Sequence, residues 1–235
     1  LGLGYRYNGD SLKVNFGGAY EWTKKKADET YPDAFNFTKN YKTFLPNAML
    51  QYNISKQSNL RINYRASSNL PSISQLQNVI DNSDPTQLSS GNPDLKQSNQ
   101  HSLSFRYSSL DSSFTKTFFA MASATFANDY IGNSVVTAGR DTVVDNISLL
   151  SNSRLTRPAN IDGYLSLNTF FSYGFPVNLI KTNLNLHTFL NYSKTPGLIN
   201  NEKNFSDSKS ASLGVTFASN VSESVDFNIS SNTSY

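Results

Sequence analysis

Apolar and polar side chains alternate with a period of two along much of this chain. In residues 60–66, apolar side chains at even positions alternate with Arg61, Asn63 and Arg65. The same rhythm returns at residues 103–107, after a long stretch rich in Ser, Asn, Asp and Pro. Side chains that alternate in this way point to opposite sides of a β-strand. The pattern therefore predicts strands with one apolar and one polar face.

Roughly ten such segments of about 10 residues follow one another along the chain, joined alternately by short turns and long polar stretches. Bacterial outer-membrane barrels keep short turns on the periplasmic side and long loops outside, so this alternation indicates an all-β, up-and-down transmembrane barrel. We expect long loops between residues 66 and 103 and at 24–40, 131–160 and 195–208, and short turns at 8–11, 55–58, 108–114, 174–176 and 220–224.

Aromatic side chains gather near the ends of the predicted strands. A ring that is apolar but carries an OH or NH group suits the boundary between lipid and water, so two aromatic girdles are expected. The alternative is that Tyr is simply common in strands. Short turns are preceded by Tyr7, Tyr52, Tyr107 and Tyr173, and long loops by Tyr20, Trp22 and Tyr192.

Several segments carry a family resemblance: Tyr64–Ile73, the Gly-Asn-Pro-Asp-Leu-Lys-Gln run at 91–97, and residues 157–164, 173–177 and 195–201. They resemble the late-barrel signature of TonB-dependent outer-membrane receptors. More narrowly, the chain is similar to the outer-membrane β-barrel family of Bacteroidota receptors, from about Leu50 to the end. A mild departure is Gln97-Ser98, where the family usually has Pro-Glu.

The resemblance implies an antiparallel partial barrel of roughly ten strands, the later part of a barrel of roughly 22. Residues 1–235 would form part of one barrel domain in the bacterial outer membrane, with the plug domain and both chain ends outside this piece. The implied activity is import of a nutrient ligand, without catalysis or a cofactor. Implied partners are outer-membrane lipid, the plug, TonB through the missing N-terminal region, and a surface lipoprotein.

Composition agrees with this interpretation and narrows the alternatives. Hydrophobic residues make up 37% of the chain and mean hydropathy is −0.44, yet barrel strands hide their lipid-facing residues in the alternation. Cysteine is absent, which excludes disulfides and thiol metal sites. A net charge of +3 is too small to indicate nucleic acid as a partner, and no basic cluster interleaves with aromatic residues, so we expect none.

Candidate metal ligands are few. His101 and His187 lie on different predicted strands with no second ligand at a suitable spacing, so we expect no metal site there. Asp81, Asp84 and Asp94 share the first long loop and have the oxygen ligands that Ca²⁺ takes. Their spacing matches no known calcium loop, and ordinary turn aspartates are the preferred interpretation.

Arginines and long loops supply the candidate binding residues. The alternation predicts that Arg6, Arg61, Arg65 and Arg106 face the lumen, where they either contact the plug, hold an anionic substrate, or line a hydrated wall. Outer loops form the mouth of such receptors, so ligand contacts are expected there. The candidates are Tyr130, Asn133, Arg140, Arg154 and Arg157.

Two other classes remain open at this point. One is a soluble or surface β-sheet binding module, carbohydrate-binding or adhesin-like, for which two apolar faces would pack against each other. The other is a complete ten-stranded barrel acting as an adhesin or enzyme. The transporter is favoured. It requires that apolar residues such as Leu103, Phe105 and Leu213 are not sealed inside a protein interior.

Overall fold

The computed structural model describes residues 1–29, 35–113, 115–144, 147–180, 182–222 and 225–234. These residues form sixteen strands, one α-helical turn and one 3₁₀ turn. Neither helix is long and apolar enough to cross a membrane. The elements are β1 (Gly2–Asn8), β2 (Leu12–Glu29), β3 (Phe35–Asn53), β4 (Ser58–Asn69), α1 (Ile73–Leu76), β5 (Ile80–Asp81), β6 (Gln87–Ser90), β7 (Ser98–Leu110), β8 (Thr117–Asn128), β9 (Tyr130–Thr137), β10 (Thr142–Val144), β11 (Ile147–Leu149), β12 (Arg154–Ile161), β13 (Tyr164–Val177), η1 (Asn178–Ile180), β14 (Thr182–Ile199), β15 (Glu202–Ser222) and β16 (Val225–Ser234).

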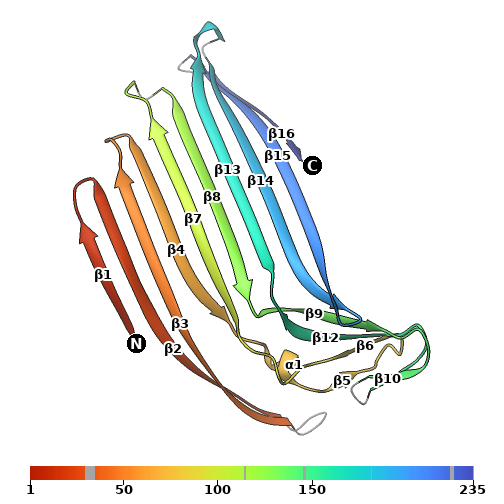
Figure 1. Ribbon diagram of the computed structural model, residues 1–235. Coiled ribbons are helices and arrows are strands. Elements are labelled where there is room, and N and C mark those ends of the chain that lie inside the picture. Colours follow the sequence, from red (N-terminus) through yellow and green to blue (C-terminus); the bar gives the residue numbers. More distant parts are fainter. Residues whose placement is uncertain (30–34, 114, 145–146, 181, 223–224, 235) are drawn as a thin grey trace.

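Ten long strands form a curved wall in the order β1-β2-β3-β4-β7-β8-β13-β14-β15-β16 (Figure 1). Each wall strand pairs antiparallel with the next one in this order, as the sequence predicts. Within the described residues the wall stays open, because β1 pairs with β2 alone and β16 with β15 alone. Apart from the short β10–β11 sheet, the described strands belong to one curved sheet, so no second sheet covers the wall as a sandwich would require.

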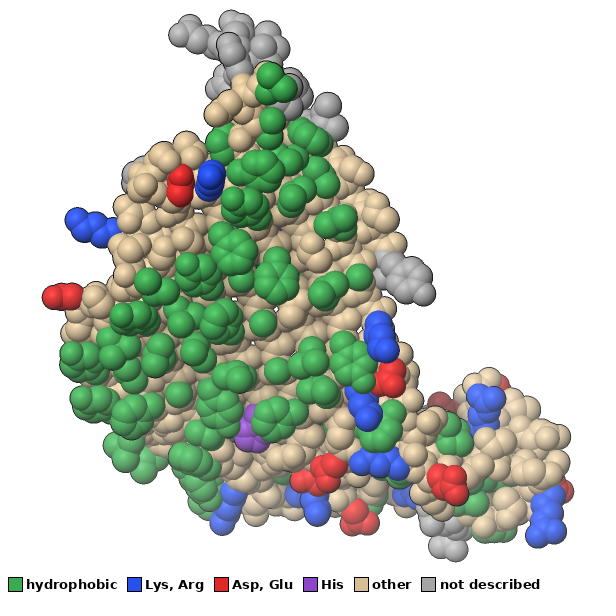
Figure 2. All heavy atoms as spheres, turned by 45° about the horizontal axis from the view of Figure 1, so that its top comes forward, with side chains coloured by type: hydrophobic (Ala, Val, Ile, Leu, Met, Phe, Trp, Pro, Cys, Tyr) green, Lys and Arg blue, Asp and Glu red, His purple; other side chains and the backbone are tan. Residues whose placement is uncertain are grey.

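The register places apolar side chains on one face of the wall, here called the apolar face. One row of paired residues across it joins Phe16, Ala48, Tyr64, Leu103, Ala124 and Leu167. The residues opposite, such as Asn63, Ser104 and Ser123, form a row on the polar face. Figure 2 shows apolar side chains gathered over the wall, with Lys and Arg at its margins.

The apolar face is open rather than sealed. Leu103 is 48% exposed, Phe105 41% and Leu213 56%, although each lies in a paired strand far from a chain end. Folding in water would bury residues of this kind, since large exposed apolar patches mark surfaces that meet another apolar phase. The arrangement fits a face that touches hydrocarbon.

The connections β1–β2, β3–β4, β7–β8 and β13–β14 lie at one end of the wall (Figure 1). Tyrosines and phenylalanines of β7, β8 and β13 form a band beside them. The Tyr107 ring lies 5.8 Å from that of Phe118, which lies 6.5 Å from Tyr173, and Tyr173 is 5.4 Å from Phe175. These rings come from three neighbouring strands on the apolar face. The band has the position expected of an aromatic girdle.

Two expected loops are strands. Residues 24–29 and 35–40 continue the β2–β3 ladder, with Lys24 paired to Asn40 and Lys26 to Thr38. Residues 195–208 belong to β14 and β15, joined by a tight turn in which Asn200 and Asn201 have φ of 50° and 67°. Charged or polar side chains on both faces resemble a loop in sequence. In water, however, a strand needs no apolar face while its backbone remains paired.

One expected turn lies a few residues away from its predicted place. Gly174 and Pro176 are paired residues of β13, and the chain turns at residues 178–180 instead. A Cβ at Gly174 would lie 2.4 Å from Asn185 Oδ1 and 2.5 Å from Thr117 Oγ1, so a larger residue there would require these two side chains to move. The last strand also continues to Ser234, farther than its polar residues indicate.

The other two long stretches fold into one small lobe at the opposite end of the wall from the short turns (Figure 1). Residues 70–98, with α1, β5 and β6, and residues 129–162, with β9 to β12, make up this loop lobe. It adds two parallel contacts to the sheet, β6 with β12 and β9 with β14. The fold is therefore mostly, not wholly, antiparallel.

The apolar face yields a direct test. Phe105 lies in the middle of that face, and Ser104 next to it lies on the polar face. In the full-length protein refolded into lipid vesicles, Phe105→Arg should lower the free energy of unfolding by about 2–4 kcal/mol, because the charge must enter hydrocarbon. The matched Ser104→Arg variant should lose less than about 1 kcal/mol. Denaturant titration of both variants measures the difference, and equal losses would contradict this assignment of faces.

Candidate functional site

The loop lobe has a hydrophobic core of its own. Leu149 and Leu155 are each 1% exposed, and Val144 packs against the cluster from the β10–β11 hairpin. Burial of leucine side chains stabilises a fold by about 1.5–3 kcal/mol each, so the lobe is a packed unit rather than a set of loose loops. The cluster consists of Leu88, Ala138, Ile147, Leu149 and Leu155.

The Gly-Asn-Pro-Asp run clasps the two halves of the lobe. Asn92 Nδ2 donates to the carbonyl oxygen of Pro158 (3.0 Å), and its Oδ1 accepts from the backbone N–H of Asp94 (3.0 Å). The Asn92 N–H donates to Gln75 O (2.6 Å). Gly91 must lack a side chain, since a Cβ would lie 2.1 Å from the backbone oxygen of Gln77. The motif therefore has a structural role: it fixes the loop against β12.

A second clasp lies next to the first. Asn160 Oδ1 accepts from the Lys96 N–H (2.7 Å), and its Nδ2 donates to Lys96 O (3.1 Å) and Asp129 O (2.9 Å). Asp162 Oδ1 accepts from the Asp129 N–H at 2.8 Å. One side-chain amide thus satisfies backbone groups of both halves of the lobe, much as a paired strand would.

Both neighbouring hairpins of the wall hold the lobe. From the β2–β3 hairpin, Lys39 Nζ donates to Pro93 O (2.9 Å) and Leu95 O (2.6 Å), and Lys25 Nζ bonds Pro71 O. From the β14–β15 turn, the Asn200 N–H donates to Val135 O (2.9 Å) while its Oδ1 accepts from the Thr137 N–H (2.9 Å). The lobe is therefore anchored at two separate places on the wall.

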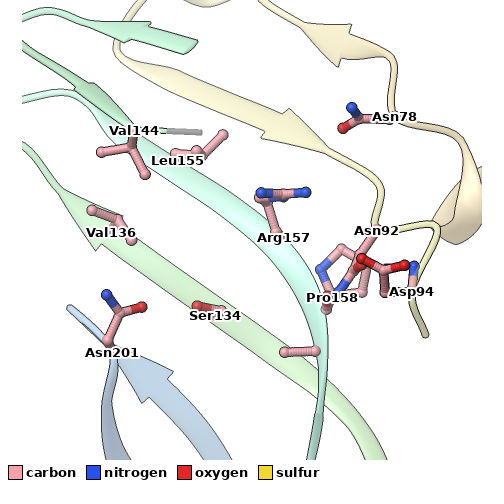
Figure 3. A pocket seen from close by; sticks show the side chains of 11 residues that line it. Asn78, Asn92, Asp94, Ser134, Val136, Val144, Leu155, Arg157, Pro158 and Asn201 are labelled. Atoms are coloured by element: carbon pink, nitrogen blue, oxygen red, sulfur yellow. Dashed lines mark hydrogen bonds between the residues drawn. The ribbon is translucent and has the colours of Figure 1, made fainter. Parts of the chain in front are cut away.

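A pocket of about 500 Å³ opens between the two halves of the lobe (Figure 3). Leu155 and Val144 lie together at one end of it, whereas Asn92 and Asp94 lie at the other. Arg157 projects from β12 between them and donates from Nε and Nη2 to Gly91 O (3.4 Å each). The full lining is Asn78, Asn92, Asp94, Ser134, Val136, Val144, Leu155, Arg157, Pro158, Ala159 and Asn201.

Two further pockets lie around the same β9–β12 ribbon. One, of about 310 Å³, lies between β9 and the β14–β15 hairpin, where Pro196 and Asn204 line it. The other, of about 330 Å³, lies between α1, β6 and β12, where Gln75 and Thr156 line it. Asn133 lines both of them. All three pockets are lined by both hydrogen-bonding and apolar groups, a lining that suits a polar organic ligand.

The structure brings together three of the five residues predicted to contact ligand. Tyr130 and Asn133 line the pocket beside β14, and Arg157 lines the 500 Å³ pocket. Arg154 begins β12 and Arg140 follows β9; both are exposed and line none of the pockets described above. Sequence reasoning missed Asn78, Ser134 and Asn201, because their approach depends on clasps between distant segments.

Tyr130 is held firmly at the base of the lobe. Its ring stacks on that of Tyr164, with centroids 4.6 Å apart and an interplanar angle of 6°. Burial, with a smaller contribution from Tyr164, raises the pKa of the Tyr130 hydroxyl. The hydroxyl is therefore neutral at physiological pH and can both donate and accept a hydrogen bond.

The four arginines predicted to face the lumen share the polar face of the wall. Arg6 pairs with Asn15, Arg61 with Arg106, and Arg65 with Ser102. Arg61 Nη2 donates to Gln51 Oε1 (2.5 Å), and the Arg106 guanidinium lies 5.0 Å from the Phe119 ring. Their contact with a plug or an anion stays a prediction.

The loop aspartates behave as turn residues. Asp81 Oδ1 accepts from Ser83, and Asp84 Oδ1 accepts from the backbone N–H (2.8 Å) and the hydroxyl (2.7 Å) of Thr86. These hydrogen bonds, first those from the hydroxyl groups, lower the pKa values of both carboxyl groups. Asp94 lies apart in the main pocket, and the described residues contain no group of three or more His, Cys, Asp or Glu side chains arranged to hold a metal ion.

A comparison with known protein families shows which family this chain belongs to. The model of the outer membrane protein beta-barrel family matches residues 2–235, which is nearly the whole chain. The chain belongs to this family. A search among curated proteins finds no match.

Family membership assigns the two ends of the wall to the two sides of the outer membrane. The protein is an outer membrane β-barrel protein, located in the bacterial outer membrane. Because such barrels keep short turns on the periplasmic side, the loop lobe lies on the extracellular side. The three pockets then lie at the extracellular end of the wall.

The clasp can be tested by removing one side chain. Asn92→Ala takes away the hydrogen bond to Pro158 O and the one from the Asp94 N–H, so the free energy of local opening should fall by about 1–3 kcal/mol. Hydrogen exchange of residues 70–98, followed by mass spectrometry on the full-length protein, measures it. The control is Asn78→Ala, which lines the same pocket and makes no side-chain hydrogen bond among the described residues. Similar exchange in both variants would contradict the role of the clasp.

Proposed function

We propose that this chain is the barrel segment of a TonB-dependent receptor, of the kind found in Bacteroidota, that imports a nutrient ligand. The observation that carries the proposal is the loop lobe: a packed, anchored extracellular cap with three adjoining pockets above a membrane wall. A plain pore has no need of such a cap. A receptor must first bind a scarce ligand, and the lobe is suited to that step.

The proposal assigns each expected partner to a particular surface of the protein. Lipid surrounds the apolar face, and the plug of the same protein fills the lumen against Arg6, Arg61, Arg65 and Arg106. TonB reaches the plug from the periplasmic side through the N-terminal region. A surface lipoprotein covers the lobe, where the exposed Arg140 and Arg154 lie. The ligand itself contacts Tyr130, Asn133 and Arg157.

Energy-dependent uptake tests the proposal in the native cell. Deleting the gene should abolish growth on at least one nutrient of a defined panel of glycans, peptides and cofactors. Loss of TonB should abolish growth on that same nutrient, and full-length protein returned on a plasmid should restore it in a TonB-containing cell. Normal growth of the deletion strain across the panel, or uptake that persists without TonB, would contradict the proposal.

The binding site is tested by filling the main pocket. Ser134 lines that pocket, and Ser134→Tyr would occupy part of its 500 Å³. The concentration of nutrient that supports half-maximal uptake should rise about tenfold or more, a loss of roughly 1.4 kcal/mol of binding free energy. The matched control is Thr142→Tyr, on an exposed position of β10. Equal uptake by both variants would place the ligand elsewhere.

A further inference from the structure

Beside the lobe, β14 and β15 carry a basic and aromatic group of side chains on the apolar face. Register pairs Tyr192 with Lys209, Lys194 with Asp207, and Pro196 with Phe205; Lys203 follows on the same face, opposite Leu198. Alternate residues of two neighbouring strands therefore point the same way. We call Tyr192, Lys194, Lys203, Phe205 and Lys209 the basic–aromatic patch.

The lysines of this patch rest on its rings. Lys194 Nζ lies 4.0 Å from the centroid of the Phe205 ring, and Lys203 Nζ lies 5.3 Å from the same centroid. Lys209 Nζ lies 5.9 Å from the Tyr192 ring. Two ammonium groups over one ring repel each other, and an anion lying between them would relieve that repulsion.

Little negative charge is available within the protein to balance the patch. Asp207 is the carboxylate in the same rows, and its Oδ1 accepts a hydrogen bond from the Tyr192 hydroxyl (3.0 Å). None of Lys194, Lys203 and Lys209 forms an ion pair among the described residues. Three cations beside one carboxylate leave a net positive charge facing outward.

The depth of the patch points to the nature of its ligand. The next row toward the short turns, through Ala122, Leu190 and Ala211, has no charged side chain on this face. Tyr192 and Lys209 continue the row of Leu103 and Leu167 at its β14–β15 end, so the patch borders the apolar rows on the lobe side of these two strands. A shallow pocket of about 340 Å³ beside Leu190, Tyr192 and Ala211 reaches from Lys209 into the apolar region.

We propose that the basic–aromatic patch binds the phosphorylated headgroup of a glycolipid of the outer leaflet. The phosphate lies between Lys194, Lys203 and Lys209, and an acyl chain follows the pocket past Leu190. Lysine stems and aromatic rings suit this boundary, because their carbon atoms contact lipid while the charges reach the headgroups. The lipid would hold the β14–β15 hairpin, and with it one anchor of the loop lobe, at a fixed height in the membrane.

Native mass spectrometry of the full-length protein tests this proposal, with diphosphoryl lipid A as the probe. The variant that replaces Lys194, Lys203 and Lys209 with Gln should bind lipid A about a hundredfold more weakly. The control replaces Lys13, Lys56 and Lys116 with Gln, an equal change of charge near the short turns. It should bind as the unchanged protein does. A shift in gel mobility on heating verifies that each variant is folded.

Other probes separate the possible sources of the signal. Fully dephosphorylated lipid A should bind much more weakly than the diphosphoryl form, and Phe205→Leu should weaken binding by about threefold through loss of the ring under two lysines. Equal binding of phosphatidylglycerol would show general attraction to anionic lipid and overturn the proposal. Displacement of lipid A by millimolar inorganic phosphate, or unchanged binding in the triple Gln variant, would overturn it as well.

Discussion

Every backbone N–H and C=O group of a strand in hydrocarbon must find a partner on a neighbouring strand, since lipid offers none. This requirement produces the ordered wall of antiparallel strands and makes its register strict. A slip of one residue would turn Leu103 and Phe105 to the polar face and Ser104 to the lipid. The side-chain alternation and the hydrogen-bond ladder therefore support the same register. Neither the alternation nor the ladder would define the register by itself.

The strand pairing continues beyond the apolar part of the wall, and the sequence pattern does not show this continuation. Around Lys24 and Lys26 the apolar signal disappears, yet the β2–β3 ladder goes on to Glu29. At 195–208 the β14–β15 ladder likewise continues through polar residues. Alternation records contact with lipid, not the presence of a strand. A prediction from alternation therefore ends the strands too early.

Wall and lobe differ in how far the sequence predicts them. Wall contacts join neighbours in the strand order, so ten strands, their faces and most short turns follow from local patterns. The lobe depends on pairs far apart in sequence, such as Asn92 with Pro158 and Asn160 with Lys96. The Gly-Asn-Pro-Asp motif is recognisable, but only the fold shows that it is a clasp. The faces of Phe118 and Phe119 also cannot be read from the sequence, because two adjacent phenylalanines do not alternate. The strand register assigns Phe118 to the apolar face and Phe119 to the polar face.

Anchoring of the loop lobe to the wall lowers the cost of ordering the extracellular end when a ligand binds. A loose loop that orders on binding spends about 0.5–1.5 kcal/mol for each side chain that it immobilises, which lowers affinity. Here Lys39 and Asn200 hold the lobe from opposite sides, and its leucines pack a core beneath the pockets. The pockets are thus largely formed before a ligand arrives. Since Arg157 already donates to Gly91 O, a ligand that competes for this guanidinium would also loosen the contact between the two halves of the lobe.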